Sequence, residues 1–79
     1  MSELNKLRWR CRRGTLELDL MLLRYLEQCY QTADEPERQA FIALLGLEDT
    51  QLLHYLMGEA RPEQAALVLL VNKICALTS

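Results

Sequence analysis

Apolar residues recur along this chain at helical spacing, and glycines and prolines divide them into five short runs. Positions three and four residues apart lie on one side of an α-helix, so each run predicts a helix with one apolar face. No segment alternates apolar and polar residues as a strand does. Because helices this short are marginal in isolation, they must bury their faces against one another. The sequence therefore predicts an all-α fold, a compact five-helix bundle that forms a single domain over residues 1–79.

Capping residues and helix breakers set the expected ends of these helices. Serine, threonine and aspartate cap helix starts, proline fits the first turn, and glycine ends helices. The expected starts are Glu3, Thr15, Thr32 or Asp34, Asp49 or Thr50, and Pro62, and the expected stops are Arg12 ahead of Gly14, then Gly46 and Gly58.

Each expected helix has a face that we assign to the core. The assigned residues are, in chain order, Leu4, Leu7 and Cys11; Leu16, Leu20, Leu23 and Tyr30, widened by Leu18, Met21, Leu22, Tyr25, Leu26 and Cys29; Ala40, Phe41, Leu44 and Leu45; Leu52, Leu53, Leu56 and Met57; and Ala66, Leu67, Leu70, Val71, Ile74 and Leu77. Because the second helix is apolar over most of its circumference, we expect it to be the central helix, buried on most sides.

Charge is distributed unevenly along the chain, although the net charge is only -2. Residues 1–24 carry six basic and three acidic groups, so this end of the molecule can attract an acidic surface. The tract Arg8–Arg13 combines arginines with Trp9, which gives one alternative function: a small nucleic-acid-binding regulator. The sequence pI near 5.3 counts against that alternative.

Catalytic and metal-binding constellations are missing from the sequence pattern. Glu17 and Asp19 are two residues apart on a helix and so lie on different faces. His54 has no cysteine or second histidine at metal-ligand spacing, and there is no glycine-rich phosphate loop. Cys11 lies among arginines that favour a reactive thiolate, but a packed apolar side chain is the expected role. We therefore expect no enzyme, no metal and no bound cofactor.

The three cysteines are odd in number and widely spaced, as in a protein of a reducing compartment. The longest apolar run, residues 65–71, is too short to insert into a membrane. The N-terminus shows no pattern of a secretory signal, so we expect a cytoplasmic chain that starts near Met1.

The junction between the first two expected helices is the strongest candidate for partner recognition. Arg13, Gly14 and Glu17 form an Arg-Gly-x-x-Glu pattern there. Arginine makes bidentate contacts with carboxylates and carbonyls, and glycine lets a partner's backbone approach closely. We predict a partner-binding site with these three residues at its centre. The residues expected to flank it are Trp9, Arg10, Arg12 and Asp19.

With these residues in view, the chain resembles the small succinate dehydrogenase assembly factors, also called flavinylation factors. The resemblance spans about Leu7 to Ile74. The residues that carry it are Trp9-Arg10-Cys11-Arg12-Arg13-Gly14, Glu17-Leu18-Asp19, Phe41-Ile42-Ala43-Leu44-Leu45, Glu48-Asp49 and Leu56-Met57-Gly58 before Pro62. The chain departs from many relatives at Tyr55, where they have tryptophan, and from some at Thr50, where they have proline.

The resemblance implies a five-helix bundle that acts as a dedicated chaperone. It implies binding to the flavoprotein subunit of succinate dehydrogenase, or of fumarate reductase, and promotion of covalent FAD attachment to a histidine of that client. FAD is then the client's cofactor, and Arg13, Gly14 and Glu17 form the contact. The resemblance does not decide which client is used, or whether the factor is a monomer or a weak dimer. A different protein-inhibitor module, such as a toxin-antitoxin component, is a second rival.

Overall fold

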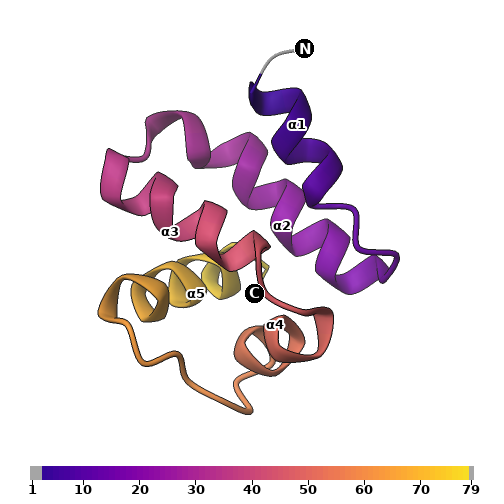
Figure 1. Cartoon of the computed structure of the whole chain (residues 1–79), viewed down its shortest axis with the longest axis vertical. Helices are drawn as coiled ribbons and strands as arrows, with labels where there is room; N and C mark the ends of the chain where they lie inside the picture. The colour runs from indigo at the N-terminus through magenta and orange to yellow at the C-terminus, as the bar shows by residue number, and fades with distance from the viewer. Residues whose placement is uncertain (1–2, 79) are drawn as a thin grey trace.

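Five α-helices and one 3₁₀ turn make up residues 3–78, the part of the chain that the computed structural model describes (Figure 1). They are α1 (Glu3–Arg10), α2 (Leu16–Gln28), the 3₁₀ turn η1 (Tyr30–Thr32), α3 (Glu35–Leu45), α4 (Asp49–Leu56) and α5 (Ala65–Thr78). No residue in this range lies in a strand, so the predicted all-α fold with five helices is confirmed. The expected start at Met1 lies outside the described residues.

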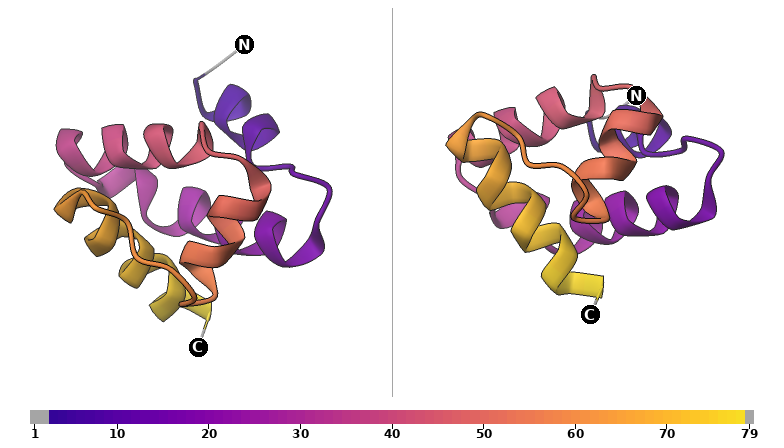
Figure 2. Two further views of the ribbon diagram at one scale, coloured as in Figure 1. Left: turned by 60° about the horizontal axis from the view of Figure 1, so that its bottom comes forward. Right: turned by 90° about the horizontal axis from the view of Figure 1, so that it is seen from below.

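Helix α5 holds the bundle together. It packs against α2, α3 and α4, whereas α1 packs mainly on α2 at the edge of the molecule (Figures 1 and 2). The side chains buried between the helices are Leu7, Cys11, Leu18, Met21, Leu22, Tyr25, Leu26, Tyr30, Ala40, Phe41, Leu44, Leu45, Leu52, Leu56, Leu70, Val71 and Ile74. All of them were predicted to face the core, so the helical spacing of apolar residues identified the core correctly.

Two buried aromatic rings of this core are joined to a polar link that extends to the surface. The ring of Tyr25 is 4.7 Å from that of Phe41, measured between centroids. The Tyr25 hydroxyl donates a 2.5 Å hydrogen bond to Glu37 Oε2, and Lys73 Nζ lies 3.0 Å from the same oxygen. These three polar side chains connect α2, α3 and α5. The Tyr25 hydrogen bond, followed by Lys73, lowers the pKa of the Glu37 carboxyl below its ordinary value of 4.5.

Helix α3 begins after Asp34, one of the two N-caps predicted for it. Asp34 is the N-cap, and its carboxylate accepts a 3.0 Å hydrogen bond from the backbone N–H of Glu37. Thr32, the other candidate, lies in η1 and donates its hydroxyl to the Cys29 carbonyl. Pro36 lies in the first turn, and the helix ends at Gly46 as predicted.

Helix α1 ends at Arg10, two residues before the predicted stop. The backbone N–H of Arg13 donates a 2.6 Å hydrogen bond to Asp19 Oδ1 instead of continuing the helix. Gly14 has φ +88°, a left-handed conformation that glycine adopts without steric strain. Thr15 occupies the N-cap of α2 as predicted, although its hydroxyl makes no capping hydrogen bond.

Two further helix starts differ from the prediction. Helix α5 begins at Ala65 rather than at Pro62, which is buried in the preceding connection. Residues 59–64 contain no serine, threonine, aspartate or asparagine, so packing rather than a cap sets this start. The N-cap of α4 is Glu48 rather than Asp49 or Thr50, and its side chain makes no capping hydrogen bond.

Four side chains predicted to face the core are exposed. On α2, Leu16 is 74% exposed and Leu20 is 50% exposed. Met57 is 44% exposed, and Ala66 lies on the outer side of α5. Helix α2 is therefore not buried on most sides: its inner face packs against its neighbours, and its outer leucine stripe faces water.

Replacing Tyr25 with phenylalanine should destabilise the fold in a pH-dependent way. Tyr25→Phe removes a hydrogen bond to a charged group, which is expected to cost about 2 kcal/mol at neutral pH. Because the folded-state pKa of Glu37 is lowered, this stability is fully present above pH 4.5, the ordinary pKa, and is lost as the pH falls through the lowered value. Urea unfolding at several pH values measures the difference.

Tyr55→Phe is the control, since the Tyr55 hydroxyl accepts a hydrogen bond from the exposed, uncharged Gln51 amide. We expect a small effect without this pH dependence. An equal, pH-independent loss for both variants would contradict the assigned role of Glu37.

Candidate functional site

Arg13 fixes the junction between α1 and α2 from within. Its side chain is only 16% exposed, and Nη2 donates a 2.5 Å hydrogen bond to the backbone carbonyl of Leu47. Nε lies 3.1 Å from Asp49 Oδ1 but makes no hydrogen bond, so that contact is an ion pair. The negative end of the α3 dipole favours a cation at this place. The guanidinium thus attaches the junction to the loop between α3 and α4.

Asp19 holds the same junction through the backbone. Its carboxylate lies in the first turn of α2, where negative charge suits the helix dipole, and it accepts the Arg13 backbone N–H. Arg13 and Asp19 were both predicted to contact a partner, and the structure gives both of them partners inside the chain. Both residues therefore hold the junction between α1 and α2 in position. The inner partners Leu47 and Asp49 could not be found from local sequence, since Leu47 is 34 residues from Arg13 and contributes only its carbonyl.

Gly14 and Glu17 form the open part of the junction. A methyl group added at Gly14 would meet no atom within 4 Å, so the space in front of this glycine is free. Glu17 is exposed, and its carboxylate forms no hydrogen bond or ion pair with residues 3–78. The junction therefore offers a bare backbone next to an unpaired negative charge. This combination can admit a partner's backbone and a basic group.

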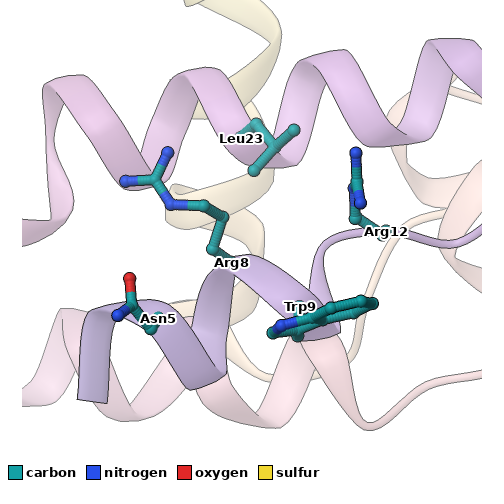
Figure 3. Close-up of a pocket in the computed structure, with 5 residues that line it drawn as sticks. All are labelled: Asn5, Arg8, Trp9, Arg12 and Leu23. Carbon is teal, nitrogen blue, oxygen red and sulfur yellow. The ribbon is translucent and has the colours of Figure 1, made fainter. Parts of the chain in front are cut away.

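Trp9 and Arg12 lie together on the outer face of α1 and the turn that follows it. Trp9 is 64% exposed, and the Arg12 guanidinium lies 5.7 Å from the centroid of its ring. The two residues line an open pocket of about 450 Å³ between α1 and α2, together with Asn5, Arg8 and Leu23. Figure 3 shows Arg8 and Arg12 on either side of Leu23, with the Trp9 ring next to Arg12. Asn5 and Leu23 were not predicted as site residues.

Three other residues considered in the sequence analysis, Arg10, Cys11 and His54, lie outside the pocket lined by Trp9 and Arg12. Arg10 is exposed on α1 and lines neither the pocket nor the junction. Cys11 is fully buried, and burial raises the pKa of its thiol to about 11 against the opposing effect of Arg13. The predicted packed role of Cys11 is thereby confirmed. His54 Nδ1 lies 3.1 Å from a carboxylate oxygen of Glu59.

The described residues contain neither a metal-binding cluster nor a membrane-spanning helix. No group of three histidine, cysteine, aspartate or glutamate side chains there could hold a metal ion. No helix there is both long enough and apolar enough to cross a membrane.

The adjacent arginines Arg12 and Arg13 should differ sharply in their effect on stability. Arg13→Ala removes a part-buried hydrogen bond and an ion pair, so we expect a loss of about 1–3 kcal/mol in the free energy of unfolding. Arg12→Ala removes an exposed side chain and should change that energy by no more than about 0.5 kcal/mol. Chemical denaturation of both variants checks this. Equal losses would mean that Arg13 does not fix the junction.

Comparison with known proteins places the chain in a defined family. The Sdh5 family, described as "Flavinator of succinate dehydrogenase", matches residues 5–78. A relative from Methylococcus capsulatus, named FAD assembly factor SdhE, is 51% identical over 77 residues, which cover 98% of this chain and 93% of the relative.

Two further relatives carry the same name. The protein from Xylella fastidiosa is 45% identical over 76 residues, which cover 96% of this chain and 78% of the relative. The protein from Vibrio cholerae is 39% identical over 71 residues, which cover 90% of this chain and 83% of the relative. The family match and these relatives extend over nearly the whole chain, and the chain therefore belongs to the family of succinate dehydrogenase flavinators.

Proposed function

We propose that this chain is an FAD assembly factor that binds the flavoprotein subunit of succinate dehydrogenase and promotes the covalent attachment of FAD to it. The family to which the chain belongs is one of assembly factors rather than catalytic enzymes. FAD belongs to the client flavoprotein, in agreement with the expectation that the factor holds no cofactor of its own.

The open junction is the observation that carries the proposed mode of binding. Gly14 leaves free space at a left-handed turn, and Glu17 beside it has no partner within residues 3–78. Arg13 and Asp19 hold this turn in place from the inner side. We infer that a client segment approaches the Gly14 backbone and places a basic group against Glu17. Trp9 and Arg12 extend the contact along α1, and Arg10 lies at its border.

A chaperone of this kind acts through differential affinity. It promotes FAD attachment only if it binds the attachment-competent conformation of the client more tightly than the other conformations. A standard interface buries about 800 Å² per partner, roughly a sixth of the 5105 Å² surface of this small chain. Such a contact can hold two client segments together, and the covalent bond then forms on a histidine of the client, as the family resemblance implies.

Fumarate reductase, whose flavoprotein subunit presents related chemistry, is proposed as a second client. We propose a monomer or weak dimer that acts in the cytoplasm before its client joins a membrane complex. Nucleic acid fits poorly as a partner, because Arg13 is engaged inside the chain and Arg8 pairs with Glu27 at 2.7 Å.

Deletion of the gene in its host tests the function directly. Covalent flavin on the succinate dehydrogenase flavoprotein subunit is measured by in-gel fluorescence, and we expect the signal to be lost and to return with the wild-type gene. An unchanged signal in the deletion strain would show that the client is another protein.

Gly14→Arg should block client binding while the bundle stays folded. Any residue other than glycine is strained at φ +88°, by about 1–2 kcal/mol. Gly14→Ala carries the same strain without the bulk, and its methyl group has open space. We expect flavin attachment to fail with arginine and to persist largely with alanine. Equal failure of both variants, at equal thermal stability, would show that backbone conformation rather than close approach matters.

Glu17→Gln should abolish or strongly reduce flavin attachment without lowering stability, because the Glu17 carboxylate has no partner within residues 3–78. Glu63→Gln is the matched control, since Glu63 is also exposed and lies in the connection before α5. In-gel flavin fluorescence and thermal unfolding are measured for both. Normal flavin attachment by Glu17→Gln would remove Glu17 from the proposed contact.

A further inference from the structure

An apolar groove lies on the outer side of α2, next to the open junction. Leu20 and Met57 line it together with Glu17, Met21 and Arg24, and the buried Met21 forms its floor. Leu16 lies one turn ahead of Leu20 on the same helix face, and it is the most exposed large apolar side chain of the described residues. We call the surface made by these six residues the α2 groove.

Contiguous exposed apolar surface on a small protein usually marks a binding site. The residues here are large and non-polar, and burying them against a partner removes unfavourable contact with water. Leu16 and Leu20 do not contribute to the core, which α2 fills with its opposite face. The outer leucine stripe therefore has no evident role in folding.

The position and charge of the groove indicate its occupant. Glu17 belongs both to the groove and to the open junction, so a client bound at Gly14 extends onto the α2 groove without a break. Arg24 lies at the other end, and its guanidinium donates a 3.4 Å hydrogen bond to the Leu77 carbonyl. Glu17 and Arg24 are two helical turns apart, about 10 Å at 1.5 Å per residue, which an extended segment spans with about three residues.

We propose that the α2 groove binds an extended segment of the flavoprotein client, and this inference rests on the proposed function. The segment carries a large apolar side chain that packs between Leu20 and Met57. A basic group on one side of it meets Glu17, and an acidic group about three residues away meets Arg24, at the spacing set by the helix rise. Glu17 joins the groove to the junction where the client is proposed to bind, which favours the client over a second copy of this chain.

The test compares exposed leucines inside and outside the groove. Leu16→Glu and Leu20→Glu place a charge in the groove, whereas Leu69→Glu places the same charge on α5, outside it. Leu16 is 74% exposed and Leu69 is 70% exposed, which makes them a matched pair. Leu16 is the first residue of α2, where a glutamate suits the helix dipole, so this variant should stay folded.

Each variant is titrated against the purified flavoprotein subunit that lacks covalent FAD, and its dissociation constant is measured. Thermal unfolding and sedimentation of each variant are measured as well. We expect Leu16→Glu and Leu20→Glu to weaken binding by roughly tenfold or more, as loss of a central contact does. Leu69→Glu should bind as the wild type does.

The possible negative results distinguish failure of the proposed function from failure of the groove assignment. If the wild type does not bind the flavoprotein, the proposed function fails together with the inference. If the wild type binds and all three variants bind equally well, the inference alone is wrong. If the wild type is a dimer that Leu16→Glu dissociates with client binding unchanged, the groove is a self-association surface and the inference is likewise wrong.

Discussion

The buried hydroxyl of Tyr25 constrains how the bundle can be assembled. The Tyr25 ring is fully buried against Phe41, so its hydroxyl needs a hydrogen-bond partner within the protein. Glu37 provides it, and Lys73 balances the charge of that carboxylate. The polar link therefore joins α2, α3 and α5 at one point of the bundle. A core of leucines alone could adopt alternative packings, whereas a buried tyrosine hydroxyl disfavours any packing that leaves it without a hydrogen-bond partner.

The residues of the arginine-glycine-glutamate motif face in two directions, one toward the interior of the molecule and two toward solvent. Arg13 faces inward and binds a carbonyl and a carboxylate of the loop between α3 and α4. Gly14 and Glu17 face outward, one offering space and the other charge. A rigid turn loses little conformational entropy when a partner binds, so a small surface can still give useful affinity. The residue that stabilises the junction and the residues proposed to bind the client are thus neighbours in the same motif.

Local signals explain which parts of the structure could be predicted from sequence. Helix α3 was predicted well because a cap at Asp34, Pro36 in the first turn and a single apolar face all agree. The start of α5 was not, because residues 59–64 contain no cap. Helix α2 has two leucine stripes, and only the positions of its neighbours decide that Leu16 and Leu20 stay outside. The inward orientation of Arg13 depends on a loop 34 residues away, which no local pattern reveals.

The placement of Cys11 has a consequence for how the edge of the molecule moves. Its thiol is fully buried and mostly protonated at neutral pH, because burial raises its pKa to about 11. Cys11 follows the last residue of α1, and α1 packs mainly on α2. A buried, protonated thiol reacts slowly, because its modification requires local opening of the structure around it. The rate at which the Cys11 thiol is modified would therefore report how often the edge formed by α1 and the following turn opens.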